Sequence, residues 1–209
     1  ESTPVLERFL KAAGHDVTVN WDADVLSDAA EMGRYDALVF NTLRVSDIAL
    51  NESEQKGMKE FISSGKGFVC IHISGCVPDT WPEYHDITGG GWVMGTSVHP
   101  PYGQFTVNVK ESAHPCAQGI ADFVTNDELY TKLGWKPGNE VFLTANLEGE
   151  TYPMAWTRSY NRGGCSARSW DTTDSASRRL PSSVSSSTAS CGPPPRTSGQ
   201  RQRHDRRSR

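Results

Sequence analysis

The stretch Gly65-Lys-Gly-Phe-Val-Cys-Ile-His-Ile-Ser-Gly75 decides the fold of this chain. Its centre, Gly67 to Ile71, is a short apolar run introduced by glycine. Such runs are typical of a strand buried on both faces of a parallel sheet. His72 follows where this strand should end, and ligands of open α/β sheets bind beyond the carboxyl ends of strands. The pattern therefore predicts that the His72 imidazole faces a binding site, in the manner of a nucleophile elbow.

The segments before this strand predict alternating helices and strands. Apolar spacing and end signals predict two helices, over residues 3–13 and 51–64, of which the second begins with the capping box Asn51-Glu-Ser-Glu54. Apolar runs predict strands over residues 15–20 and 35–41, and the acidic segment 21–34 between them predicts a loop with a short helix. This order is typical of a doubly wound α/β sheet of flavodoxin type, which a strand before Glu1 would complete.

The remaining strands are predicted in the second half of the chain. Alternating or continuous apolar runs indicate strands over residues 105–109, 127–130, 140–145 and 152–157. Loops rich in Gly, Pro, His and Trp fill the interval between His72 and the first of them. The sequence after Arg158 shows neither helical nor strand periodicity.

Composition divides the 209 residues into two unlike parts. Up to Tyr160 there are 22 acidic and 11 basic side chains, whereas the remainder has 3 acidic residues, 10 Arg and no Lys. The second part is rich in Ser, Arg and Pro, a composition typical of disorder. We read this basic segment as a solvated tail and expect no nucleic-acid partner, because it lacks interleaved aromatic residues and any binding-fold signature. No apolar run reaches the length of a membrane span, so no membrane partner is expected.

Nine motifs in order resemble the ThuA-like, or trehalose-utilisation, family: Tyr35-Asp-Ala-Leu-Val-Phe-Asn, Gly65-Lys-Gly-Phe-Val-Cys-Ile-His, Trp81-Pro-Glu-Tyr-His, Gly89-Gly, His99-Pro, Phe105-Thr-Val-Asn-Val, His114-Pro, Asp127-Glu-Leu-Tyr and Pro153-Met-Ala-Trp-Thr-Arg. The resemblance covers about residues 1–162. It implies a flavodoxin-like three-layer sandwich, similar to class I glutamine amidotransferases, that is incomplete at both ends here. We accordingly expect a ThuA-like domain over residues 1–162 and a disordered tail over residues 163–209, and we interpret the tail as an out-of-frame translation.

The candidate site consists of imidazoles, carboxylates and aromatic rings on the loops that follow strands. We predict that His72 and Glu128 are catalytic, since imidazole and carboxylate can exchange protons near neutral pH. His99, Trp81 and Tyr130 are predicted to bind the substrate. Alternation along a strand would send Asp127 and Glu128 to opposite faces, and the family motif favours Glu128 with Tyr130.

Two other imidazoles and a metal remain secondary interpretations. His85 and His114 are predicted to serve turns or caps rather than the site. Two His and one Glu could hold zinc, but the spacings of 13, 14 and 15 residues between the histidines match no compact metal motif. Whether the site binds a metal is therefore left open, and no cofactor is predicted.

The thiols argue against glutamine hydrolysis. A class I amidotransferase needs a cysteine on the elbow, whereas here Cys70 lies two residues before it, inside the predicted strand. Cys70 is therefore predicted to be a core residue, and Cys76 is the thiol nearest the opening. Five cysteines without paired spacing indicate a reducing, cytoplasmic setting.

The resemblance implies a protein of carbohydrate metabolism without glutamine amidotransferase activity, whose partner is a small carbohydrate such as trehalose, a related disaccharide or an oxidised sugar. Whether it is an enzyme is left open. One alternative is a non-catalytic domain that binds a sugar or a partner protein. Another is a flavin-binding relative of flavodoxin. The sequence makes no prediction of oligomeric state.

Overall fold

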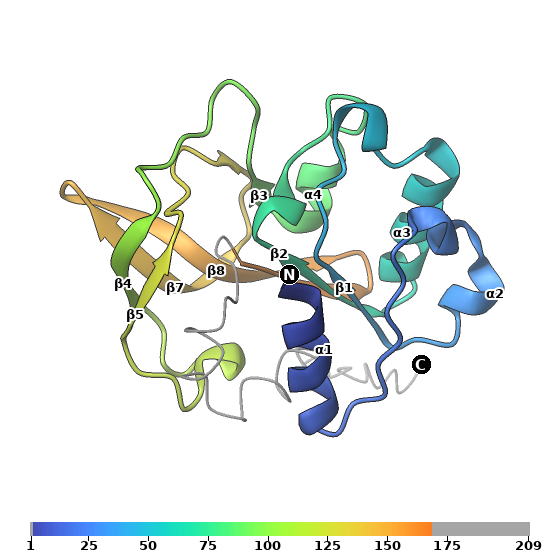
Figure 1. The fold of residues 1–209 in the computed structure, drawn as a ribbon, viewed down its shortest axis with the longest axis horizontal. Coiled ribbons are helices and arrows are strands. Elements are labelled where there is room, and N and C mark those ends of the chain that lie inside the picture. The colour runs from blue at the N-terminus through green and yellow to red at the C-terminus, as the bar shows by residue number, and fades with distance from the viewer. Residues whose placement is uncertain (1, 169–209) are drawn as a thin grey trace, which may run out of the picture.

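The computed structural model describes residues 2–168 of the chain (Figure 1). The helices are α1 (Ser2–Ala12), α2 (Ala29–Met32), α3 (Glu52–Ser63) and α4 (Tyr84–Thr88), with short 3-10 turns η1 (Ala23–Ser27), η2 (Ser46–Ile48), η3 (His72–Gly75) and η4 (Pro115–Ala117). The strands are β1 (Ala37–Phe40), β2 (Gly67–Ile71), β3 (Gly90–Gly91), β4 (Gly103–Val109), β5 (Phe123–Asp127), β6 (Gly134–Trp135), β7 (Glu140–Leu147), β8 (Glu150–Tyr160) and β9 (Gly163–Arg168). Within this part of the chain, every helix is too short or too polar to cross a bilayer.

Most of the strands form one mixed sheet in the order β1-β2-β9-β8-β7-β4-β5. The pairs β1–β2 and β2–β9 are parallel, whereas the pairs from β9 to β5 are antiparallel. β3 and β6 form a separate two-stranded sheet. β2 therefore has a parallel neighbour on each side, as its sequence predicts.

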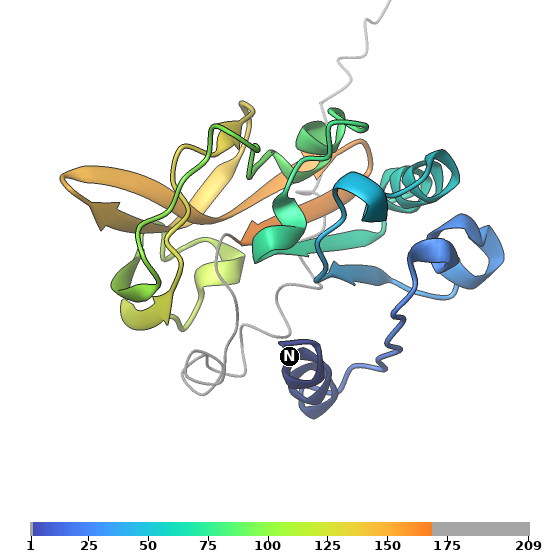
Figure 2. The ribbon, with the colours of Figure 1, turned by 45° about the horizontal axis from the view of Figure 1, so that its top comes forward.

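α1 lies on one side of the parallel part of the sheet, and α3 and α4 lie on the other (Figure 2). α3 buries Met58, Phe61 and Ile62 in one core with Phe68 and Cys70 of β2. A second core lies under the antiparallel part, where η4 packs against β4, β7 and β8. The α/β layered fold predicted from the sequence is confirmed.

The two elements that flank the elbow form as predicted. Phe68, Val69, Cys70 and Ile71 of β2 are all buried, as expected for a strand covered on both faces. α3 begins with the expected capping box: Asn51 accepts from the Glu54 backbone N–H, and the Glu54 carboxylate accepts from the Asn51 N–H at 2.8 Å.

Two strand predictions were wrong. Residues 15–20 contain no strand, because a strand needs a neighbour to share its hydrogen bonds and the sheet within residues 2–168 ends at β1 on this side. The strand predicted over residues 127–130 ends at Asp127 instead, as β5.

The chain also continues in the sheet beyond the boundary expected at Arg162. β9 lies between β2 and β8 and forms hydrogen bonds with both. Its sequence has no strand pattern, so the strand depends on these two neighbours. The rest of the expected tail, residues 169–209, lies outside the described residues. The interpretation of an out-of-frame tail remains a prediction.

Gly57 lets α3 approach η1 closely. A Cβ atom at this position would lie 1.7 Å from the Leu26 carbonyl oxygen, so the backbone of one element would have to move. Leu26 and Met58 belong to the core beneath this contact.

Replacing Gly57 by Ala should therefore lower the free energy of unfolding by about 1–3 kcal/mol through overpacking. The higher helix propensity of Ala would by itself stabilise the protein by up to about 1 kcal/mol relative to Gly. The sign of the measured change in the free energy of unfolding therefore shows whether overpacking or propensity dominates. Urea unfolding followed by circular dichroism measures it. Ser53→Ala, at an exposed position of the same helix, is the matched control and should change stability by less than about 0.5 kcal/mol. A more stable Gly57→Ala protein would contradict the close contact.

Candidate functional site

His72 stands directly after β2 and has a left-handed backbone conformation, with φ of 50°. A side chain on such a residue is strained, and strain of this kind concentrates at functional sites. The turn η3 that holds it is fixed from two sides. Ser74 Oγ accepts from the Thr42 N–H at 2.8 Å, and a Cβ atom on Gly91 would lie 1.9 Å from the Gly75 carbonyl oxygen. The strand end and these contacts together aim the imidazole out of the sheet.

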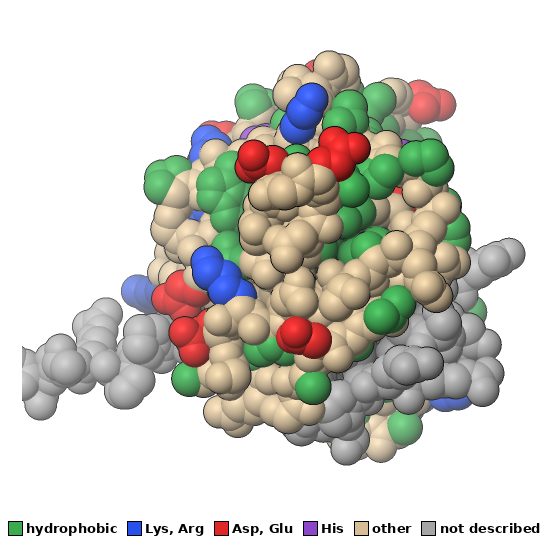
Figure 3. Space-filling model, turned by 90° about the vertical axis from the view of Figure 1, so that its left-hand side faces the viewer, with side chains coloured by type: hydrophobic (Ala, Val, Ile, Leu, Met, Phe, Trp, Pro, Cys, Tyr) green, Lys and Arg blue, Asp and Glu red, His purple; other side chains and the backbone are tan. Residues whose placement is uncertain are grey.

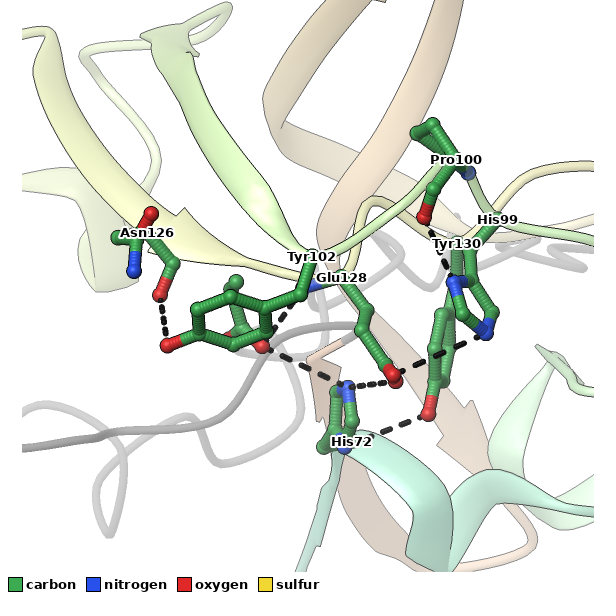
Figure 4. A network of polar contacts seen from close by, with 8 residues as sticks. His72, His99, Pro100, Tyr102, Asn126, Glu128 and Tyr130 are labelled. Atoms are coloured by element: carbon green, nitrogen blue, oxygen red, sulfur yellow. Dashed lines mark hydrogen bonds and ion pairs between the residues drawn. The ribbon is translucent and has the colours of Figure 1, made fainter.

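Two neighbouring carboxylates face the same imidazole nitrogen (Figure 4). His72 Nε2 lies 4.0 Å from Asp127 Oδ1 and 3.9 Å from Glu128 Oε2. The Asp127 side chain is 4% exposed and the Glu128 side chain is 33% exposed, so the second is the one that a solute can reach. The expectation that only one of the pair could point at the site was wrong. β5 ends at Asp127, so strand alternation no longer separates the two side chains.

A group of aromatic rings holds His72 from the other side. The Tyr130 ring stacks on His72, with centroids 4.3 Å apart. Trp92 lies against Tyr130 at 4.7 Å, and His99 lies 5.6 Å from Trp92 and 5.8 Å from Tyr130. Tyr130 is buried, so its ring is packing for the imidazole rather than an open platform.

The Tyr130 hydroxyl lies beside the other ring nitrogen of His72, Nδ1. Burial first, and the nearby Glu128 carboxylate second, raise the pKa of Tyr130 above its usual value, so the phenol keeps its proton. Its oxygen lies 3.4 Å from His72 Nδ1. When the phenol donates to Nδ1, the proton of the neutral ring is on Nε2, the nitrogen that faces the carboxylates.

His99 lies at the exposed edge of this group. Its Nδ1 is 2.8 Å from the Pro100 carbonyl oxygen, and its Nε2 is 3.7 Å from Glu128 Oε1. Glu128 therefore lies between two imidazoles, each facing one of its oxygens. The structure thus brings together His72, Glu128, His99 and Tyr130 of the predicted set.

Trp81 does not join them. It is 5% exposed and packs against Tyr84 in the core beside α3, with ring centroids 5.1 Å apart. This buried position is inconsistent with the predicted contact between Trp81 and a substrate. Trp92 is the tryptophan beside the site. The sequence feature that could have identified Trp92 as a site residue is its position directly after Gly89-Gly-Gly, where β3 ends.

Of the two histidines predicted to serve turns or caps, His114 has that role in the structure. His114 is the N-cap residue of η4, where its Nδ1 accepts from the Cys116 N–H, and its ring stacks on Phe142 at 4.5 Å. His85 lies in α4, and burial is the main cause that lowers the pKa of both imidazoles. Both rings are therefore held in the neutral form.

The thiols of Cys70 and Cys76 are buried and poorly suited to act as nucleophiles. Burial raises the pKa of Cys70 to about 12, and its Sγ lies 3.5 Å from the Tyr84 hydroxyl in the core. Cys76, expected near the opening, is 3% exposed, and burial raises its pKa too. Among residues 2–168, groups of three or more His, Cys, Asp or Glu with the geometry of a metal site are absent.

Comparison with known proteins gives a family and a fold. A family model described as ThuA, trehalose utilisation, matches residues 1–173. A ThuA-like protein of Bacteroides uniformis has a similar structure, with a TM-score of 0.70, 16% identity, and 89% of this chain and 81% of that chain covered. For a ThuA-like protein of Parabacteroides merdae the TM-score is 0.64, the identity 18%, and the covered shares 80% and 73%.

A cytoplasmic protein of Salmonella typhimurium gives a TM-score of 0.65 at 13% identity, with 91% of this chain and 86% of that chain covered. At these identities the likeness concerns the fold alone. No curated protein matches the sequence.

The buried thiols predict resistance to alkylation in the native protein. With a pKa of about 12, only about one Cys70 side chain in ten thousand is a thiolate at pH 8, and the core shields it further. Iodoacetamide at pH 8 should modify Cys70, Cys76 and Cys116 at least about tenfold more slowly in the folded chain than in urea. Peptide mapping by mass spectrometry separates these residues from the other cysteines. Fast native labelling of Cys70 would contradict its assignment to the core.

Proposed function

This chain belongs to the ThuA, or trehalose-utilisation, family, and on that premise we propose that it acts on a carbohydrate, either a disaccharide or an oxidised sugar derivative. The observation that supports this proposal is the meeting of His72 with Glu128 at the carboxyl end of a central parallel strand. Ligands of such sheets bind at this edge. His72 and Glu128 are the catalytic residues of the proposal.

The geometry suits proton exchange with a sugar hydroxyl. His72 Nε2 and Glu128 Oε2 are 3.9 Å apart, so one hydroxyl oxygen can lie about 2.8 Å from each of them at the same time. The Nε2–H group donates a hydrogen bond to that oxygen and stabilises the negative charge that develops there as the Glu128 carboxylate accepts the hydroxyl proton. A base positioned in this way contributes about 10²–10⁴-fold to a reaction rate.

The other site residues position these two. Tyr130 holds the His72 ring by stacking and by its hydroxyl, and so acts on the substrate through His72. His99 is exposed and faces Glu128, where it can donate to a sugar hydroxyl or to the carboxylate. Trp92 supplies a partly buried aromatic face beside them.

We also propose that the protein has no glutamine amidotransferase activity and works in a reducing, cytoplasmic setting. A glutaminase of class I would need a thiolate at the elbow, where this chain has His72. Cys70 and Cys76 are free thiols, as expected where thiols are kept reduced.

Replacing His72 by Asn should lower turnover of trehalose or of its oxidised derivatives by about 100-fold or more, because the imidazole that faces the reacting oxygen is lost. Asn is the informative substitution because it tolerates the left-handed conformation that His72 adopts, with φ of 50°. Steady-state kinetics with product analysis measure turnover, and calorimetry measures binding.

Unchanged turnover would remove His72 from the mechanism. Wild-type protein that binds a disaccharide but converts none of these sugars would instead favour the non-catalytic binding domain.

Replacing either of the two carboxylates near His72 should lower turnover, but by different amounts. Glu128→Gln removes the base that a substrate can reach and should reduce turnover about 100-fold or more, whereas Asp127→Asn, at a buried position, should reduce it less. The kcat values of both variants at pH 7 measure this difference. Glu150→Gln, an exposed change on β8, is the matched control and should leave kcat unchanged. Equal activity of wild type and Glu128→Gln would exclude Glu128 as the base.

A further inference from the structure

One ring nitrogen of His99 is engaged by the backbone, and the other faces Glu128. His99 Nδ1 lies 2.8 Å from the Pro100 carbonyl oxygen. A carbonyl oxygen only accepts hydrogen bonds, so Nδ1 is the donor of this contact and carries a proton. In the neutral ring the lone pair is then on Nε2, which lies 3.7 Å from Glu128 Oε1. His99 therefore presents a proton-accepting atom to the carboxylate that serves as the base in the proposed reaction (Figure 4).

Two anchors hold the segment around His99 against the segment that carries the base. Before His99, Val98 and Thr131 form a β-bridge, in which their backbone N–H groups donate to each other's carbonyl oxygens at 3.2 and 2.8 Å. The Thr131 hydroxyl also donates to the Val98 carbonyl oxygen, at 2.9 Å. After His99, the Tyr102 hydroxyl donates to the Asn126 carbonyl oxygen at 2.7 Å. The fold itself therefore sets the distance between the imidazole and the carboxylate.

His99 lies on the solvent side of the base. Its side chain is 33% exposed, whereas that of His72, on the other side of Glu128, is 13% exposed. The titratable groups that face His99 are the Glu128 carboxylate and the Tyr130 phenol, whose pKa is raised by burial so that it keeps its proton. A proton on the His99 ring can therefore pass to water.

The surface near the end of β5 carries charges of both signs. On the side of the molecule formed by β4, β5 and the β7–β8 hairpin, acidic and basic side chains are dispersed among uncharged groups (Figure 3). β5 ends directly before Glu128. A small buffer molecule that approaches from this side therefore meets mixed charge rather than a field of one sign.

We propose that His99 is a proton relay, which takes from Glu128 the proton that this residue accepts from the substrate and releases it to solvent. The inference rests on the proposed function. It gives His99 a role in proton transfer beyond the predicted contact with substrate, and His99 acts on the reaction through Glu128.

The relay has two steps, and each conserves charge and protons. Glu128 accepts the substrate proton on Oε2, the oxygen near His72, and a half-turn of the carboxyl group brings that proton to the side of His99. The acid then gives the proton to His99 Nε2, either directly after the 3.7 Å gap closes to about 2.8 Å or through one water molecule. This leaves a carboxylate and an imidazolium, which is favourable because a carboxylic acid is a stronger acid than an imidazolium. The imidazolium finally gives its proton to water or to a buffer molecule.

His99→Asn in the full chain is the variant that tests the relay. The Asn amide has an N–H group in the place of Nδ1, so it can keep the contact with Pro100, but it takes up no proton at neutral pH. With trehalose or its oxidised derivatives at pH 7 and low buffer concentration, the kcat of this variant should fall about tenfold or more. Its kcat/KM should stay unchanged, because the relay acts after the chemical step, whereas loss of a substrate contact would lower kcat/KM.

Added imidazole separates proton transfer from a structural role. At constant pH and ionic strength, imidazole in the buffer should restore the kcat of His99→Asn to within about twofold of wild type, since the free base carries the proton that the side chain no longer carries. Thr131→Val is the matched control. It removes the hydroxyl that holds Val98 but no titratable group, so any loss of kcat in this variant should not respond to imidazole.

Each outcome decides between the two proposals. A lowered kcat of His99→Asn at unchanged kcat/KM, restored by imidazole while Thr131→Val does not respond, would support the relay. An unchanged kcat, a loss that imidazole does not restore, a lowered kcat/KM, or an equal response of Thr131→Val would overturn the relay and leave the proposed function standing. Wild type that converts none of these sugars would overturn the proposed function and the relay together.

Discussion

A strand buried on both faces can carry a functional polar side chain only at its end, and this constraint governs the whole site. β2 lies between two parallel strands, and its residues from Phe68 to Ile71 are buried. A charged or imidazole group within it would have to leave water without partners, at a cost of several kcal/mol. The first position that escapes this cost is His72, where the left-handed backbone turns the chain away from the sheet. The sheet thus determines both which residue can act and the direction in which it points.

The second half of the site follows from where another strand ends. The backbone N–H of Glu128 donates to Asp127 Oδ1 at 2.8 Å, which replaces a ladder hydrogen bond by a local one as β5 finishes. Two successive carboxylates then face one imidazole instead of opposite faces of a sheet. Their exposure differs: the Asp127 side chain is buried, whereas a solute can reach the Glu128 carboxylate.

Sequence reasoning succeeded where a residue's environment is determined locally. The capping box of α3, the buried strand β2 and the place of His72 after it all depend on neighbours within a few residues. It failed where distant partners decide. The predicted strand over residues 15–20 needs a neighbour, β9 is formed by pairing with β2 and β8, and the burial of Trp81 depends on Tyr84 and the core beside α3. The pairing of Asp127 with His72 depended on the last residue of β5, and strand ends are the least predictable feature of a sequence.

The residue at the elbow also limits the chemistry that this fold can support. An amidotransferase-like sheet with sulfur at the strand end forms a covalent intermediate, but here the nearest thiol on that strand, Cys70, lies in the core with a pKa of about 12. The imidazole in its place is stacked on Tyr130 and faces two carboxylates, an arrangement whose chemistry suits proton exchange rather than acyl transfer. Sugar hydroxyls are weak acids, so a reaction on them needs a base and an acid held together more than it needs a nucleophile. The residue at this one position therefore limits the chemistry that the scaffold can support, because the sheet already fixes the geometry of whatever group stands there.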